Sequence, residues 1–213
     1  MVDLVKQHLR TGHTWIASFA SLVALAFSGY NFAQLQEDPR PVVTLPLTLK
    51  LWRDGEKTSV FLQPAVYTRF STEDAEIITD VRLALRATHG GPEPKFFWED
   101  NVRFTASHDP KSYDDITIWW EFESDPAPFI VSQTQPQRPA LQFSTLGWQL
   151  TPGRYDGTLT LRRASTHAPI ERSFCLLLNA EAIKRVSRGN RYYDFRTDVP
   201  GRSQGGCYQL YLG

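Results

Sequence analysis

Strict alternation between apolar and polar residues is the feature of this chain that most restricts its fold. It appears in three stretches, at residues 45–52, 80–87 and 115–122. A period of two places successive side chains on opposite faces of a β-strand, so that one face is buried and the other meets water. Strands with one wet face usually pair antiparallel, because parallel sheets are normally covered on both sides. The three stretches therefore predict an antiparallel sheet.

The rest of the chain after residue 44 extends this pattern. Further segments predicted to be strands lie near residues 60–70, 95–104, 128–134, 140–148, 154–163 and 171–178. The turn signals between strands are Asp54-Gly55, Gly90-Gly91-Pro92, Asp109-Pro110 and Pro152-Gly153. About eight or nine short strands, with no long amphipathic helix between them, favour a sandwich over a parallel α/β sheet. We therefore expect an all-β domain, an antiparallel β-sandwich, over residues 45–179.

A short run at residues 149–161, with the sequence QLTPGRYDGTLTL, places a turn and a tyrosine ahead of an alternating strand. Its characteristic members are Leu150, Pro152 and Tyr155. The run resembles the tyrosine corner of immunoglobulin-like and fibronectin-type sandwiches, in which the tyrosine hydroxyl bonds to upstream backbone. The resemblance implies an immunoglobulin-like or fibronectin-like sandwich and carries no activity with it.

The N-terminal segment carries no formally charged side chain between Arg10 and Glu37. Its apolar part, residues 15–35, spans about 31 Å as a helix, which matches the hydrocarbon core of a bilayer. We therefore predict a transmembrane helix at residues 14–36, after a tail at residues 1–13 and before a linker at residues 37–44. A secretory signal cleaved after Ala24-Leu25-Ala26 is the alternative.

The charges flanking this segment predict its orientation. Lys6 and Arg10 precede it, and Glu37 and Asp38 follow it closely. Because basic flanks stay on the cytoplasmic side, we expect a cytoplasmic N-terminus and a periplasmic or extracellular domain. The excess of arginine over lysine suggests a bacterial genome rich in G and C. The expected location is thus the inner (plasma) membrane, crossed once.

Small residues recur along the same segment at spacings of three and four. They are Ala17, Ala20, Ser21, Ala24 and Ser28. These spacings place them on one helical face, where they permit close packing against another transmembrane helix. The expected partners are therefore other membrane-protein subunits within the lipid bilayer.

The two cysteines, Cys175 and Cys207, form neither a CxxC nor a CxxCH motif. This excludes thioredoxin-type redox chemistry and c-type haem attachment on motif grounds. In an oxidising compartment the two can pair, and a loop of that length contributes roughly 3–4 kcal/mol of stability. Two reduced thiols are the alternative, because the spacing in sequence does not establish a distance in space.

The sequence shows no arrangement of residues that indicates catalysis. His89, His108 and His167 each lie beside turn-forming residues, and no GxSxG motif presents a serine. The adjacent acidic pairs at residues 73–74 and 114–115 lack calcium-loop spacing, and no HExxH motif is present. The formal net charge is zero, without a basic stripe, which disfavours nucleic acid as a partner. We expect no enzyme activity, no cofactor and no metal; a hydrolase with an unrecognised site remains a third hypothesis.

Two tryptophans fall on the polar faces of predicted strands. Trp52 shares its face with Thr48 and Lys50, and Trp119 shares its face with Thr117 and Glu121. A tryptophan on a polar face offers a large contact area, so both are candidates for an interaction surface. The alternative is that another strand or the aromatic C-terminal extension, residues 180–213, covers them.

The leading hypothesis is a non-enzymatic, membrane-anchored accessory subunit that braces a bacterial envelope complex through its helix and its exoplasmic sandwich. The alternative is a carbohydrate-binding sandwich at the cell surface or secreted from it, because sugar rings stack on exposed tryptophan. In that case the partner is a glycan.

Overall fold

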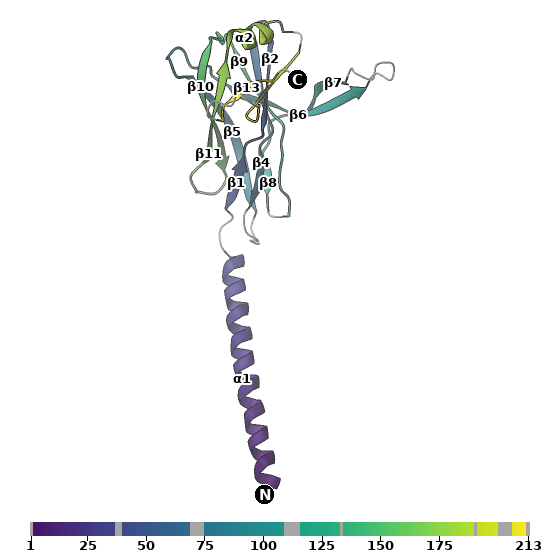
Figure 1. The fold of residues 1–213 in the computed structure, drawn as a ribbon. Helices are drawn as coiled ribbons and strands as arrows, with labels where there is room; N and C mark the ends of the chain where they lie inside the picture. The colour runs from purple at the N-terminus through teal and green to yellow at the C-terminus, as the bar shows by residue number, and fades with distance from the viewer. Residues whose placement is uncertain are drawn as a thin grey trace.

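The computed structural model describes residues 2–36, 40–68, 75–108, 116–132, 134–189, 191–199 and 206–211. Its elements are α1 (Val2–Leu35), β1 (Pro41–Thr44), β2 (Thr48–Asp54), β3 (Lys57–Leu62), β4 (Ala65–Thr68), β5 (Glu76–Ala87), β6 (Phe97–His108), β7 (Ile116–Ser124), β8 (Phe129–Val131), β9 (Leu141–Leu146), β10 (Gly153–Arg163), β11 (Ile170–Leu178), α2 (Ala180–Val186), β12 (Tyr193–Arg196) and β13 (Tyr208–Leu210). The prediction of an all-β domain is confirmed (Figure 1).

Most of the strands belong to one sheet that curls into a sandwich-like shape. Its order is β7-β6-β9-β3-β2-β12-β13-β11-β10-β5-β8, and β1 and β4 form a separate pair. One core cluster holds Leu49, Val60 and Phe143 from one half of the sheet together with Leu83 and Leu159 from the other half. The two halves therefore face each other across a shared apolar interior.

The C-terminal strands lie in the middle of this sheet. β12 pairs with β2, with Tyr193 opposite Leu51, and β13 pairs with β12 and with β11. The β11–β13 pair is parallel, whereas the other strand pairs described are antiparallel. β12 and β13 thus join the two halves of the sandwich, and α2 leads into them, its N-terminus capped by the side chain of Asn179.

The alternating pattern predicts the core well in β5 and less well in two other places. Val81, Leu83 and Leu85 are all buried. Leu47, expected on the core face with Leu49, is 59% exposed, because β2 begins only at Thr48, after Pro46 and Leu47. Phe122, expected in the core, is 57% exposed, because the ladder between β6 and β7 has a bulge where Phe122 pairs with Val102.

Residues 2–35 form one helix, α1, which extends from the end of the domain that carries β1, β4 and β8 (Figure 1). Within the part of the chain that the structure describes, no helix is both long and apolar enough to cross a membrane. The predicted transmembrane span at residues 14–36 is therefore not supported. Its second half contains Ser28, Gly29 and Asn31, whose polarity or small size lowers the mean hydropathy of the segment.

Candidate functional site

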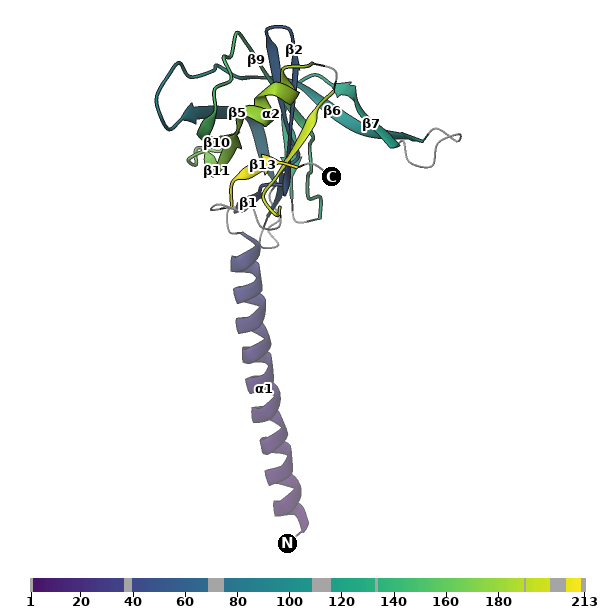
Figure 2. The same ribbon diagram turned by 45° about the horizontal axis from the view of Figure 1, so that its top comes forward.

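A two-stranded arm formed by β6 and β7 projects from the body of the domain (Figures 1 and 2). The first part of β6 pairs with β9, and the rest pairs only with β7. Trp120 fastens the arm to the body: its ring centroid lies 6.0 Å from that of Trp52 and 5.6 Å from that of Phe61. Phe104 of β6 adds a further edge contact to Phe61, at 5.8 Å. These rings form a second, smaller apolar cluster on the outer face of β2 and β3.

The two tryptophans expected on polar faces have different surroundings. Trp52 is partly buried under Trp120, so a neighbouring strand covers it. Trp119 is 43% exposed on the other face of the arm, and its indole N–H lies 3.4 Å from Glu121 Oε1. Arg103 Nη2 also lies 3.4 Å from Glu121, at Oε2. Trp119 is therefore a large side chain that this face of the arm exposes to solvent.

A partly buried polar network lies at the base of the arm, around Glu99. Its Oε1 accepts from Lys57 Nζ at 2.5 Å, and its Oε2 accepts from Ser144 Oγ at 2.5 Å and from Gln142 Nε2 at 2.8 Å. Burial raises the pKa of Glu99, but these hydrogen bonds and the charge of Lys57 together outweigh burial and lower it. Burial and then the charge of Glu99 raise the pKa of neighbouring Asp100.

This network is structural in character. Gln142 and Ser144 are fully buried, so neither side chain is accessible to a substrate. Glu99 is the extra residue where the β6–β9 register shifts between Trp98 and Asp100. Its bonds tie β3, β9 and β6 together at the point where the arm leaves the sheet. Sequence reasoning missed this group; the available signal was the polar residues at alternate positions of β3 and β9.

A lysine on β2 connects the arm to the C-terminal segment. Lys50 Nζ lies 2.5 Å from Asp194 Oδ1, 4.5 Å from the ring centroid of Tyr192 and 5.3 Å from that of Phe104. Burial, and then the charge of Asp194, raise the pKa of Tyr192 to about 12. An ammonium group between two rings and a carboxylate combines an ion pair with cation–π attraction. It stabilises the position of the arm against β12, beside a cavity of about 360 Å³.

Among the described residues, His167 lies near a serine and a carboxylate, in an arrangement that differs from a catalytic triad. His167 Nδ1 lies 3.1 Å from Ser165 Oγ, and Ser165 Oγ donates to Glu76 Oε2 at 2.9 Å. Glu76 also lies 3.3 Å from Arg163 Nη1, and both side chains are nearly buried. In a catalytic triad the histidine lies between the serine and the carboxylate and accepts the serine proton. Here the Ser165 hydroxyl donates to Glu76, and His167 does not lie between the serine and the carboxylate.

Only some of the acidic and histidine residues that could ligate a metal lie in the part of the chain that the structure describes. Among the residues it describes, no group of three or more His, Cys, Asp or Glu side chains could hold a metal ion. The acidic pairs at residues 73–74 and 114–115 lie outside the described residues, as does the side chain of His108.

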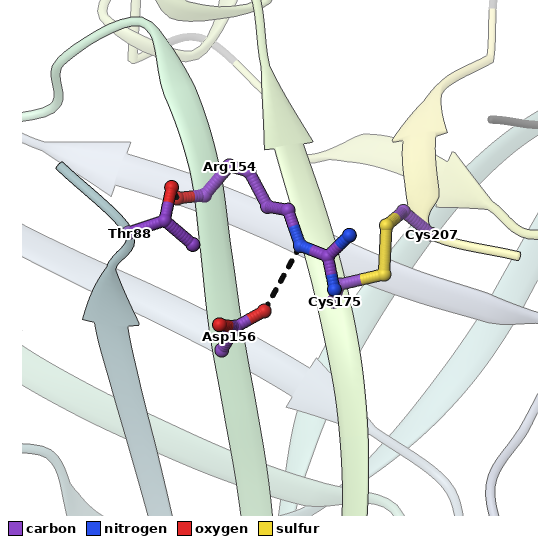
Figure 3. Close-up of a disulfide and its surroundings, with 5 residues drawn as sticks. All are labelled: Thr88, Arg154, Asp156, Cys175 and Cys207. Atoms are coloured by element: carbon purple, nitrogen blue, oxygen red, sulfur yellow. Dashed lines mark hydrogen bonds and ion pairs between the residues drawn. A yellow bond between two sulfur atoms is a disulfide. The ribbon is translucent and has the colours of Figure 1, made fainter. Parts of the chain in front are cut away.

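The structure contains a disulfide between Cys175 of β11 and Cys207, which immediately precedes β13 (Figure 3). Both cysteines are buried, and the bridge joins the two parallel strands where β13 enters the sheet. On the strand next to Cys175, Arg154 Nε donates to Asp156 Oδ1 at 3.0 Å. The bridge therefore fixes the C-terminal segment to the body of the sandwich.

The turn before β10 has the geometry of a tyrosine corner. The hydroxyl of Tyr155 donates to the carbonyl oxygen of Thr151 at 2.9 Å and accepts from the Thr151 backbone N–H at 3.1 Å. The ring packs edge-on against Trp148, with centroids 5.5 Å apart. Pro152 lies within this turn and Leu150 packs against the core beside it.

Helix α1 presents two contrasting faces. At about 100° per residue, Trp15, Phe19 and Leu22 fall on one stripe, and Ala20, Ala24 and Ser28 fall on the opposite one. All of these side chains are exposed, and Trp15 reaches 78%. Leu25, Phe27, Tyr30 and Phe32 are further large exposed side chains of α1. Ser21 is also exposed on the small-residue stripe, while the side chain of Ala17 lies outside the described residues.

The described residues thus include two exposed surfaces with large apolar side chains: α1, and the outer part of the β6–β7 arm with Trp119. Comparison with protein-family models, with curated proteins and with solved structures found no match.

Proposed function

We propose that this chain is a non-enzymatic accessory subunit of a bacterial envelope membrane complex, and that α1 attaches it to that complex. The observation that carries the proposal is the exposure of large apolar side chains along α1, from Trp15 to Phe32. Contiguous exposed apolar surface of this kind marks a contact with a membrane or with another protein. The domain would then brace the complex outside the bilayer.

The two faces of α1 support a position between lipid and a partner helix. Large aromatic and aliphatic side chains such as Phe19 and Leu22 suit acyl chains, whereas Ala20, Ala24 and Ser28 let a neighbouring backbone approach closely. A helix of modest hydropathy gains from such a neighbour, because the partner shields its hydroxyl and amide groups from lipid. We therefore propose that partner subunits contact the small-residue stripe.

The disulfide supports placing the domain on the oxidising side of the membrane. Disulfides persist in the periplasm and outside the cell and are rare in the cytosol. An N-terminus on the cytoplasmic side, with Lys6 and Arg10 in the first turns of α1 and before its apolar part, agrees with the positive-inside rule. We also propose that the domain is an immunoglobulin-like variant, which the tyrosine corner at Tyr155 supports.

The test replaces small residues of α1 by a bulky apolar one. Ala20→Ile together with Ala24→Ile keeps α1 apolar but obstructs close approach of a partner helix. Leu22→Ile, on the stripe opposite the small residues, is the control. After mild-detergent purification of the full chain from its native host, mass spectrometry of the intact assembly measures how much partner accompanies each variant.

We expect the alanine variant to lose most of the partner and the leucine variant to retain it. Recovery of the unaltered protein as a lone monomer, or equal partner recovery for both variants, would contradict the proposal.

A second candidate function is glycan binding, and the specific observation that favours it is Trp119. Its exposed indole lies beside the charged pair of Glu121 and Arg103, which offers acceptors and donors to hydroxyl groups next to a ring face. Polysaccharide retention of the full chain, compared with Trp119→Ala, tests this function. Retention that depends on Trp119 would favour it, and absence of retention across a glycan panel would exclude it.

A further inference from the structure

We propose that the outer edge of β7 accepts an extended, positively charged segment of a partner protein as an added β-strand. This inference deepens the proposed interaction role, because it names a second contact surface and the chemistry of what binds there. It concerns the arm alone, so it can fail or hold independently of α1.

β7 is a long strand at one end of the sheet. It is the terminal strand of the large sheet, it has nine residues, and among the described strands only β6 pairs with it. The strand at the other end of the sheet, β8, has only three residues. Short terminal strands leave little edge for another chain to join, whereas a long one presents a row of unpaired backbone groups. Among the described strands, the sheet thus leaves little edge for addition at β8 and a long edge at β7.

The direction of the backbone groups of β7 follows from its register with β6. The N–H of Val102 donates to the carbonyl of Ala140 next to β9, at 2.8 Å, so the adjacent Arg103 directs its N–H and C=O towards β7. Arg103 pairs with Glu121, and Thr105 pairs with Trp119. The backbone groups of Glu121 and Trp119 therefore bond to β6.

It follows that the residues between and beside them, Trp120 and Ile118, direct their N–H and C=O groups outward. Two outward-facing residues at a spacing of two form the repeating unit to which an added strand bonds.

The edge of β7 is held in place by contacts with the body of the domain. Trp120 packs on Trp52 and Phe61, and the Glu99 network fixes the root of β6. A preorganised edge loses little conformational entropy when a strand joins it. The exposed ring of Trp119 then offers additional apolar contact to side chains of the incoming strand.

The charge near the end of β7 identifies the chemistry of the strand that is added there. Glu121, Glu123 and Asp125 lie at or just after the end of β7, and all three are exposed. Arg103 is the basic side chain that contacts this group, and it lies 3.4 Å from Glu121. Three carboxylates against one guanidinium leave this part of the edge negative. A second copy of β7 would place like charges together, whereas a lysine-bearing or arginine-bearing strand would place opposite charges together.

The test uses the full chain in detergent micelles and a synthetic peptide of about nine residues that alternates lysine with valine. A glutamate–valine peptide of the same length is the charge control. Trp fluorescence and backbone amide exchange by NMR report binding. Two variants separate the edge from the side chain: Ile118→Pro removes an outward N–H, and Ile118→Ala changes the side chain but keeps that N–H.

We expect the lysine peptide to bind, to slow amide exchange at Ile118 and Trp120, and to bind more weakly as salt is raised. Ile118→Ala should retain binding, and Ile118→Pro should weaken it at least tenfold while leaving the native circular dichroism spectrum unchanged. Equal affinity of the two variants, equal affinity of the two peptides, or no binding of the lysine peptide at millimolar concentration would each overturn the inference.

The same peptide assay on the Ala20→Ile, Ala24→Ile variant distinguishes the two proposals. That variant should bind the peptide normally, even though we expect it to lose its partner helix.

Discussion

Removal of the Cys175–Cys207 bridge should destabilise the protein by an amount that its position in the chain determines. The cysteines are 32 residues apart. In the chain-entropy model a loop of this length lowers the entropy of the unfolded chain by about 12.4 cal/mol/K, which corresponds to about 3.7 kcal/mol at 25 °C. Both cysteines are buried between strands, so alanine at each position keeps the site apolar.

The variant with both Cys175→Ala and Cys207→Ala should therefore unfold at a lower urea concentration than the unaltered protein, by the equivalent of about 3.7 kcal/mol. The unaltered protein treated with a reductant serves as a matched control and should move in the same direction. The urea dependence of the unfolding free energy should rise slightly, because the unfolded chain without the bridge exposes more surface.

The loss of stability should be greatest in the strands next to the bridge. β12 and β13 should exchange their amide protons faster relative to β9 and β10, since the bridge holds the C-terminal strands at their entry into the sheet. A loss below about 1 kcal/mol would refute the chain-entropy argument for this protein. A uniform rise in exchange across all strands would refute the local part of it.

Three further predictions concern the interior of the domain. Tyr155→Phe removes the hydroxyl that bonds to the backbone of Thr151. Urea unfolding should show that the free energy of unfolding falls by about 1–2 kcal/mol. An unchanged urea midpoint would mean that the tyrosine contributes only packing. Arg163→Met alone should lower the free energy of unfolding by about 3–5 kcal/mol, because it leaves the buried Glu76 carboxylate without its cation. The double variant Arg163→Met, Glu76→Leu should lower it much less. Equal losses for the two variants would contradict a buried ion pair. Because folding lowers the pKa of Glu99, its contribution to stability is fully present above the ordinary glutamate pKa of 4.5 and is lost as the pH falls through the lowered pKa of the folded state. Glu99→Gln should therefore flatten the acid limb of the stability profile, and a parallel shift of the whole profile would count against this assignment.

Much of the fold follows from local sequence pattern, where strands are long enough to show it. The alternation at residues 80–87 predicts β5 and its buried side chains, since each apolar residue contributes independently to the same face. The turn at Pro152-Gly153 and the alternation after it predict β10 for the same reason.

The parts that local pattern could not predict are set by contacts between distant segments. β12 and β13 have four and three residues, too few to show a period, and they become strands by pairing with β2 and β11. Trp52 and Trp119 both lie on polar faces by alternation, and only the path of the arm determines that Trp52 is covered by Trp120. The polar network around Glu99 likewise depends on a bulge that no local signal marks.

The position of the C-terminal strands has a consequence for the order in which the chain can fold. β12 and β13 follow the other strands in sequence, yet they lie between β2 and β11, and Tyr193 pairs with Leu51 across more than half of the chain. During synthesis or export, β2, β3 and β9 on one side and β5, β10 and β11 on the other can form before they are joined. Closure of the apolar interior between the two halves of the sandwich must then wait until the last strands have emerged. A chain halted before residue 193 would hold two open sheet edges, and the apolar residues between them would be exposed to chaperones and proteases until the last strands join the sheet.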